Sequence, residues 1–203
     1  MSIFQNTCKP KGLLGQMMVS MMNRGHAAMA EWGLQHITVR EDGRSLDIGC
    51  GGGANVKRLL ERSPKGQVKG LDYSAVSVEA TENLNSKAIA EGRCAVLQGD
   101  VMNMLFAKNY FDLVTAFETV YFWPDIYKAF RDIHHILRED GVFLICNEAD
   151  GHHAKDEKWT EKIEGMTIYN ADQLKSALEQ AGFSDIQIDD NEEKDWLCVT
   201  ARK

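Results

Sequence analysis

The feature that most limits how this chain can fold is a glycine-rich turn at residues 49–53, where four of the five residues are glycine. The turn follows a segment, 44–49, that is typical of a short buried strand, and precedes a segment at 54–63 that is typical of a helix. Glycine allows the unusual backbone angles of a sharp turn and lets a ligand approach the main chain closely. This order is typical of open parallel α/β sheets, which bind ligands beyond the carboxyl ends of their strands.

The rest of the chain continues this alternation. Strands are expected at 68–72, 94–98, 111–117 and 142–147, and helices at 74–92, 124–138 and 170–181. Two closing strands, 183–189 and 196–201, have no helix between them and predict an antiparallel hairpin. The pattern predicts a doubly wound, Rossmann-like α/β fold with a mostly parallel sheet and helices on both faces.

The helix predicted at 74–92 has a regular apolar spacing. Ser74 is expected to cap its first turn. The apolar residues that indicate the helix recur every four positions: Val76, Ala80, Leu84 and Ala88.

Two segments fall outside the alternation. Residues 1–43 are rich in methionine and helical in pattern, which predicts an N-terminal helical cap in front of one domain, 44–203. Residues 148–167 are strongly charged and irregular, although Trp159, Ile163 and Met166 keep a helical spacing. The cap and this loop are expected to supply the substrate-binding surface, which favours a compact substrate.

Composition and charge exclude several classes of protein. The formal net charge of −7 over 203 residues disfavours contact with nucleic-acid backbones. No apolar run is long enough to span a bilayer, and the N-terminus lacks the apolar stretch of a signal peptide. The five cysteines are odd in number and form no C-x-x-C pair, which favours reduced thiols. We expect a cytoplasmic protein with no nucleic-acid or membrane partner.

Acidic residues lie at the ends of the first three predicted strands. Asp72 is well placed to accept hydrogen bonds from a ribose diol, although an acid there also suits a helix N-cap. Asp100 follows the third strand and can accept from the exocyclic amine of a purine, or simply face solvent. Asp47 lies within the first strand, two residues before Gly49. Together with the glycine turn, these acids indicate a nucleotide-like ligand.

Two cofactors fit such a site. Gly49, Gly51 and Ala54 together with Asp72 satisfy the dinucleotide fingerprint, so an NAD-dependent oxidoreductase is an alternative. However, an acid-lined pocket suits a ligand that carries positive charge better than one with two phosphates. The chain also leaves no room for a separate substrate domain.

Several motifs resemble the class I S-adenosylmethionine-dependent methyltransferases. Leu46–Gly53 resembles the glycine motif of that family, Asp72 its ribose acid, and Gly99–Val101 its adenine-side motif. Further similar segments run from Phe111 to Thr119, from Ile136 to Phe143 and from Leu178 to Phe183. The resemblance covers about residue 44 to the C-terminus and implies a seven-stranded sheet with one antiparallel strand. It also implies S-adenosyl-L-methionine as the cofactor.

The resemblance implies roles for individual residues. Gly49 and Gly51 are expected along the methionine part of the cofactor, and Asp47 near its amino group through water. Tyr73 is expected over the adenine, with the backbone near Phe117 touching the amino-acid tail. The full set expected to bind the cofactor is Asp47, Gly49, Cys50, Gly51, Asp72, Tyr73, Ser74, Asp100, Val101, Phe117 and Glu118. Cys50 also suits a packing role better than that of a nucleophile.

The methyl acceptor is less clearly indicated. The candidates for its site are Asn23, His26, Tyr121 and Trp123, with Trp32 and Phe122 as neighbours. The aromatic run 121–123 could form a substrate wall or pack beneath the next helix, and the methionines of the cap could form a lid or a core.

No catalytic signature is visible, because methyl transfer needs a base only when the acceptor must lose a proton. Weak candidates for this role are His26, Tyr121 and Glu148; His152 and His153 could serve as bases or simply be solvated. His134 and His135 look structural, and no metal site is expected because no third ligand has convincing spacing. The sequence predicts methyl transfer to a small molecule. A non-catalytic cofactor-binding protein, and a methyltransferase acting on RNA or protein, remain alternatives.

Overall fold

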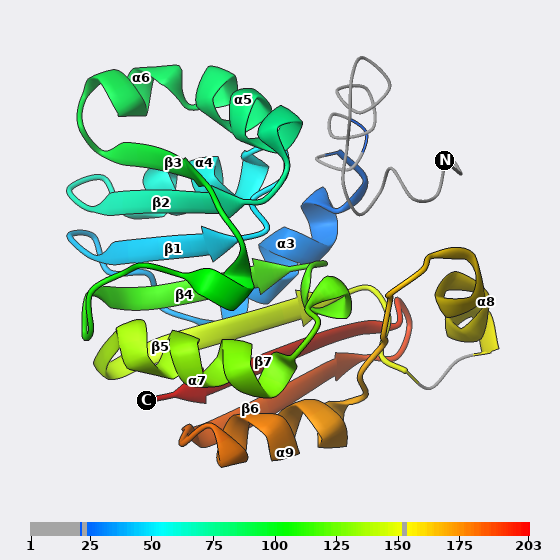
Figure 1. Ribbon diagram of the computed structural model, residues 1–203. Coiled ribbons are helices and arrows are strands. Elements are labelled where there is room, and N and C mark those ends of the chain that lie inside the picture. Colours follow the sequence, from blue (N-terminus) through cyan, green and yellow to red (C-terminus); the bar gives the residue numbers. More distant parts are fainter. Residues whose placement is uncertain (1–20, 22–23, 152–153) are drawn as a thin grey trace.

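The computed structural model describes residue 21, residues 24–151 and residues 154–203. A seven-stranded sheet in the order β3-β2-β1-β4-β5-β7-β6 forms its centre (Figure 1). The strands are β1 (Arg44–Ile48), β2 (Gln67–Asp72), β3 (Cys94–Gln98), β4 (Phe111–Phe117), β5 (Leu137–Asn147), β6 (Ser184–Asn191) and β7 (Trp196–Arg202). Only β7 is antiparallel to its neighbours β5 and β6, so the predicted fold is confirmed.

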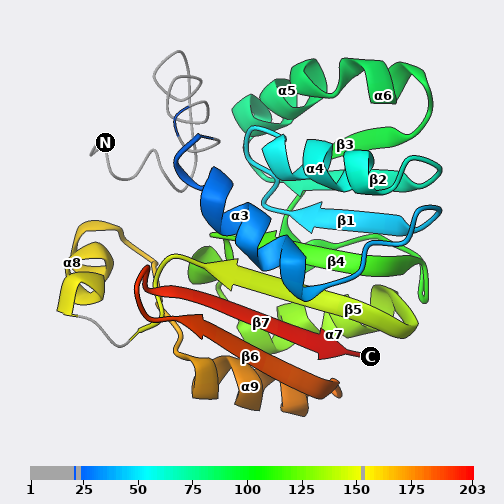
Figure 2. The same cartoon turned by 180° about the vertical axis from the view of Figure 1, so that it is seen from behind.

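Helices cover both faces of the sheet. They are α3 (Ala27–Gly33), α4 (Ala54–Arg62), α5 (Ala75–Leu84), α6 (Ser86–Ala90), α7 (Ile126–Ile136), α8 (Ala154–Lys162) and α9 (Ala171–Gln180). Three short 3-10 turns are η1 (Leu34–His36), η2 (Val101–Asn103) and η3 (Val120–Phe122). Figure 1 shows α7 and α9 in front of the sheet, and Figure 2 shows α3 and α4 on the opposite face.

The strand β5 carries a core on each of its faces. Phe143 faces α7, where its ring packs edge-on against Phe130 with the ring centroids 5.4 Å apart. Cys146 faces the other side and contacts the fully buried Met29 of α3. This alternation follows from the period of two in a strand, and burial on both faces explains why β5 is apolar from Val142 to Cys146.

The predicted cap can be followed only from residue 24. Met29 and Ala30 of α3 are buried against the sheet, whereas Met21 is exposed. Asn23 and the methionines at 17, 18 and 22 lie outside the described residues. No helix in the described part of the chain combines the length and the apolar surface that a bilayer crossing requires.

The prediction of a single helix over residues 74–92 was wrong. The helix breaks at Asn85, whose side-chain amide donates to the carbonyl oxygens of Thr81 and Gly53, at 2.9 and 3.2 Å. Side chains that bond to nearby backbone in this way compete with the helical pattern. The buried face also differs from the apolar spacing, because it consists of Ser77, Thr81, Asn85 and Ala88, whereas Leu84 is 45% exposed.

Other boundaries differ by smaller amounts. β5 begins at Leu137 rather than at 142 because Leu137 already pairs with Phe111 before a bulge shifts the register. The region 148–167, predicted to be irregular, contains the helix α8. Ile163, directly after this helix, is buried.

We predict that Gly53 is required for the fold and not merely for the backbone conformation of its turn. Both Gly53 and Gly92 have left-handed φ angles, 78° and 72°. A Cβ at Gly53 would lie 2.8 Å from the Thr81 Cα, whereas one at Gly92 would meet nothing within 4 Å. Gly92→Ala should therefore cost about 1–2 kcal/mol of unfolding free energy, from the backbone angle alone. Gly53→Ala should cost about 2 kcal/mol more, because α5 must move.

Urea denaturation of the two variants measures this difference. Equal losses of unfolding free energy would show that the close approach of α5 to the turn does not matter for stability.

Candidate active site

A cavity of about 250 Å³ opens at the carboxyl ends of the parallel strands. Its walls come from the turn between β1 and α4, from the ends of β2, β3 and β4, and from His26, the residue just before α3. This is the edge at which open α/β sheets bind ligands, and the residues that line it come from segments far apart in the sequence.

The glycine turn is held from three sides. Gly49, Gly51 and Gly53 all have positive φ angles. The N–H of Gly49 donates to Leu71 of β2 at 2.7 Å, and a Cβ at Gly49 would lie 2.2 Å from the Thr119 hydroxyl oxygen. Glycine is therefore required at position 49 by both the backbone angle and the lack of space.

The polar face of α5 binds the same turn. The Thr81 hydroxyl donates to the Gly51 carbonyl at 2.8 Å, and the Asn85 amide donates to that of Gly53. These bonds explain why the helix buries polar rather than apolar side chains: it satisfies carbonyl groups of a turn that has no regular partner.

Asp72 connects the turn to the start of α5. Its Oδ2 accepts from the N–H of Gly51 and its Oδ1 from that of Ser74, both at 2.9 Å. Burial raises the pKa of Asp72, although these N–H donors oppose the shift. Each carboxylate oxygen has a second lone pair, so Asp72, which lines the cavity, can also accept from a ligand.

Asp47 lies beneath the cavity and not in its lining. Only 2% of it is exposed, and its Oδ1 accepts a hydrogen bond from the Thr115 hydroxyl at 2.7 Å. Burial raises the pKa of Asp47 to about 7. Asp47 is thus a buried acid of the sheet, and its predicted role toward an amino group through water stays a prediction.

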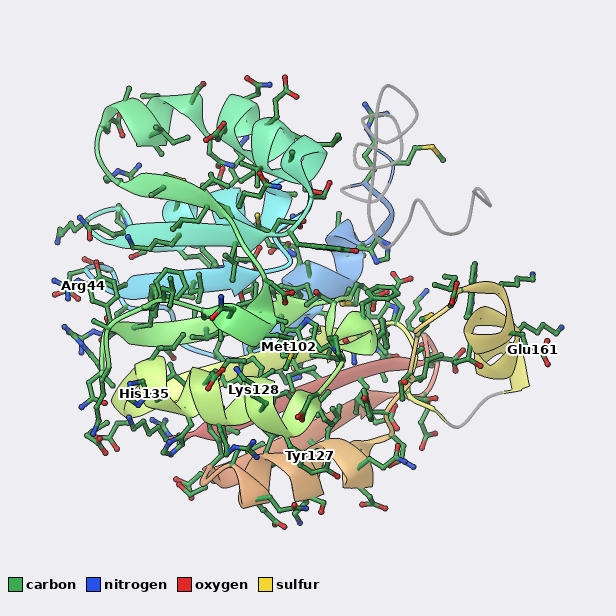
Figure 3. The ribbon with its side chains drawn as sticks, viewed as in Figure 1. Arg44, Met102, Tyr127, Lys128, His135 and Glu161 are labelled. Carbon is green, nitrogen blue, oxygen red and sulfur yellow. The ribbon has the colours of Figure 1, made fainter. Side chains whose placement is uncertain are left out.

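The far wall of the cavity contains the predicted adenine side. Asp100 is exposed and caps η2, with its Oδ1 accepting from the N–H of Met102 at 2.9 Å. Val101 is buried and Tyr73 is half-exposed at the rim. The Lys128 ammonium group of α7 donates to the Met102 carbonyl at 2.7 Å, and Figure 3 shows these two residues close together. This contact holds η2 against the helix.

Two glutamates and a histidine lie close together at the end of the cavity away from the predicted adenine side. Glu118 follows β4 directly, in a left-handed backbone conformation with φ 56°, and Glu148 follows β5. The Glu118 Oε1 accepts hydrogen bonds from the Tyr121 hydroxyl at 3.0 Å and from the N–H of Glu148. Burial, together with the nearby charge of Glu148, raises the pKa of Glu118 to about 8.

His26 completes this group from the N-terminal side. Its Nδ1 lies 3.6 Å from the Glu118 Oε2 and 3.6 Å from the Glu148 Oε1. One ligand atom from each of the three residues lies within 4.8 Å of the others, which is a spacing that could hold a metal ion. These residues could also move a proton.

The aromatic residues 121–123 were predicted either to form a wall of the substrate site or to pack beneath the next helix, and the structure shows both kinds of position. Tyr121 is buried beneath the cavity, where its hydroxyl accepts from the N–H of Ala149 at 3.0 Å and burial raises its pKa. Phe122 and Trp123 line the cavity. Trp123 also packs edge-on against Phe130, with centroids 6.1 Å apart, and donates from Nε1 to the Thr119 hydroxyl at 3.3 Å.

The structure brings most of the predicted site residues to one cavity. Those that line it are His26, Gly49, Cys50, Gly51, Asp72, Tyr73, Asp100, Val101, Phe117, Glu118 and Trp123. Those described residues that do not line it are Asp47, Ser74, Tyr121 and Glu148, and Asn23, His152 and His153 lie outside the described residues. Ser74 instead caps α5, its hydroxyl accepting from the N–H of Ser77 at 3.4 Å.

Other candidates have structural surroundings. Cys50 is buried, its Sγ 3.6 Å from the Thr81 hydroxyl oxygen, and burial raises its pKa, so a nucleophilic thiolate is disfavoured. Trp32 packs against His36 and Trp196, with centroids 4.7 and 5.8 Å away. His135 lies toward the end of α7 that is remote from the strands' carboxyl ends (Figure 3).

Sequence reasoning missed several lining residues. Asn55 and Arg58 lie one turn apart on α4, and their i, i+3 spacing directly after the glycines was a signal that could have placed them. Arg58 donates from Nε to Glu31 of α3 at 2.8 Å, so it joins the cavity wall to the N-terminal helix. Thr119 gave no such signal, because its role depends on contact with a glycine far away in the sequence.

Comparison with known proteins agrees with this geometry. Residues 46–145, about half of the chain, match the family model described as "Methyltransferase domain". The cycloartenol-C-24-methyltransferase of Arabidopsis thaliana is 29% identical over 147 residues, which cover 68% of this chain and 44% of that protein. The 27-O-demethylrifamycin SV methyltransferase of Amycolatopsis mediterranei is 28% identical over 152 residues, covering 72% and 56%. The chain thus spans about half the length of these curated relatives.

A solved structure is similar over nearly the whole fold. It comes from the complex between the Trm112 methyltransferase activator of Haloferax volcanii and a methyltransferase, with a TM-score of 0.85 and 19% identity, covering 92% of this chain and 93% of that one. The fold, the glycine turn and the family match together define the class. The chain belongs to the class I S-adenosylmethionine-dependent methyltransferases. The cofactor predicted from the sequence is the one this family uses.

We predict that Asp47 makes stability depend on pH. Its pKa is about 7 in the folded protein and 3.8 when free, so on unfolding above pH 3.8 the group ionises. Stability should therefore fall as pH rises toward 7 and level off above it. Asp47→Asn keeps an acceptor for Thr115 but cannot ionise. The unfolding free energy of the variant minus that of the wild type should therefore increase by about 3 kcal/mol from pH 5 to pH 8.

Urea titrations at the two pH values test this without cofactor. If the unfolding free energies of the two proteins changed by the same amount between pH 5 and pH 8, Asp47 would be ionised in the folded state.

Proposed function

We propose that this protein transfers the methyl group of S-adenosyl-L-methionine to a small-molecule acceptor. The observation that carries the proposal is that Asp72 and the glycine turn line one cavity whose other end holds His26 and Glu118. A carboxylate beside a turn of free main chain suits a ribose joined to an amino-acid tail.

The lining residues support one orientation for the cofactor. Adenine lies near Asp100 and Val101, the ribose diol at Asp72, and the methionine part along Gly49 and Gly51. The sulfonium methyl then points toward the end of the cavity where His26, Glu118 and the ring of Trp123 lie. In the transfer, the bond from sulfur to the methyl carbon breaks as the bond from the acceptor atom forms. The protein's work is to align the two and to exclude water.

The volume of the cavity and the net charge of the whole chain support a small acceptor. A cavity of about 250 Å³ must hold both cofactor and acceptor, apart from what extends through its mouth. The net charge of −7 disfavours an RNA acceptor. The residues at the acceptor end that can take a proton are His26, Glu118 and Glu148. The odd number of cysteines supports a cytoplasmic setting.

We predict that the product S-adenosylhomocysteine binds through Asp72. Isothermal titration calorimetry should show binding by the wild-type protein, weakened by about 1.5–3 kcal/mol in Asp72→Asn because a hydrogen bond to a charged group is lost. Asp112→Asn is the matched control. Asp112 also accepts a hydrogen bond from a main-chain N–H, that of Arg44 at 2.8 Å. However, it lies near the start of β4, at the end of the strands away from the cavity. Its substitution should leave the affinity unchanged.

Three outcomes separate the alternatives. No binding of S-adenosylhomocysteine would falsify the proposal, and a fluorescence response to NADH in its place would favour the dinucleotide alternative. Binding with no methyl transfer to any of a broad panel of acceptors would favour a non-catalytic binding protein.

A further inference from the structure

The acid pair at the acceptor end follows from the topology of the sheet. β4 and β5 are parallel neighbours, with Phe117 paired to Cys146, and the N–H of Glu118 donates to the Cys146 carbonyl at 3.0 Å. Residues that directly follow the two strands therefore emerge side by side. Two glutamates at these positions place two carboxylates close together.

His26 is brought to the same point by the packing of α3. The residue immediately precedes this helix, and one turn later Met29 is fully buried, in contact with Cys146 near the end of β5. The imidazole of His26 thus lies over both glutamates, with 29% of its side chain exposed.

The distances within this group do not fit ordinary hydrogen bonds. The His26 Nδ1 lies 3.6 Å from one oxygen of each glutamate, which is too far for a hydrogen bond. The same nitrogen is shielded from solvent and has no hydrogen-bond partner. Two ligand atoms bound to one ion at 2.0–2.2 Å lie about 3.0–3.6 Å from each other, so the observed spacing is that of atoms sharing an ion.

The glutamate oxygen that faces His26 is also held in position. The Tyr121 hydroxyl and the N–H of Glu148 both bond to the Glu118 Oε1, which leaves Oε2 directed at the histidine. The Tyr121 hydroxyl is in turn fixed by the N–H of Ala149. Outer groups that orient a ligand in this way are characteristic of metal sites.

No lysine or arginine in the described part of the chain forms an ion pair with either glutamate; their ion pairs are with His26. Arg58 lines the same cavity, but its guanidinium group is engaged by Glu31 and Asn55. The two carboxylates therefore leave room for a cation that the protein itself does not provide.

We infer that His26, Glu118 and Glu148 form a binding site for a divalent transition-metal ion at the acceptor end of the cavity. The imidazole nitrogen suits Zn²⁺ better than Ca²⁺ or Mg²⁺, which prefer oxygen ligands alone, and the two carboxylates also suit Mn²⁺. Three protein ligands leave coordination positions open toward the cavity. An oxygen atom of the acceptor can take one of them, a role that rests on the proposed function, whereas the binding of the ion itself does not.

Electron paramagnetic resonance of Mn²⁺ tests the site directly, because the sharp signal of the free aqueous ion disappears on binding. The wild-type protein should remove the signal at a ratio of one ion per chain, and Zn²⁺ should restore it by competition. Glu148→Gln and His26→Gln should each weaken Mn²⁺ binding by about 100-fold or more. Tyr121→Phe, which removes only an orienting hydroxyl, should weaken it by about tenfold.

His36→Gln is the matched control. His36 lies 3.8 Å from Asp189, which makes it a histidine–carboxylate pair outside the cavity, and its loss should leave the Mn²⁺ titration unchanged. Circular dichroism verifies that each variant is folded. A wild-type protein that leaves the Mn²⁺ signal intact, or a Glu148→Gln variant that binds as the wild type does, overturns the inference.

The failure of this inference can be told from a failure of the proposed function. A protein that binds S-adenosylhomocysteine without binding Mn²⁺ retains the cofactor site and has only an ion pair at the acceptor end. A protein that binds Mn²⁺ and not S-adenosylhomocysteine has the metal site without the proposed activity.

Discussion

The hydrogen bonds that hold the glycine turn are the interaction on which the rest of the site depends. Strand β2 pairs with the start of this turn through Leu71, and the carbonyl and N–H groups that follow need other partners. The structure satisfies them with the Asp72 carboxylate, the Thr81 hydroxyl and the Asn85 amide. These partners position α5 against the turn, and they keep the Asp72 carboxylate at the cavity wall. The fold and the ligand site are therefore stabilised by the same few bonds, which explains why an amphipathic helix here buries a polar face.

Burial of acidic groups is the second theme. Asp47, Asp72 and Glu118 all have raised pKa values, and burial is the main cause in each. Removing carboxylates from water costs stability unless N–H or O–H donors compensate. Such cost is typically accepted near functional sites, where the charge or the proton is used. Here the three acids lie along one edge of the sheet, two of them in the cavity wall and one beneath it.

The helix α3 contacts the cavity at two separate points. α3 brings His26 to the two glutamates, and Glu31 on the same helix accepts from Arg58 in the cavity wall. Met29 between them packs against β5. One short helix thus contacts both the wall of the cavity at Arg58 and the group of His26, Glu118 and Glu148.

The sequence alone determined the class of fold and the position of the cavity, because strands, helices and the glycine turn are local patterns with recognisable periods. It also placed about half of the residues that line the cavity, since the carboxyl ends of parallel strands must share one edge. Only the tertiary structure decided the face of α5, the role of Thr119 beside Gly49 and the burial of Asp47. The meeting of His26, Glu118 and Glu148 was decided there as well. These features depend on side chains that approach across large sequence separations, and no local pattern carries that information.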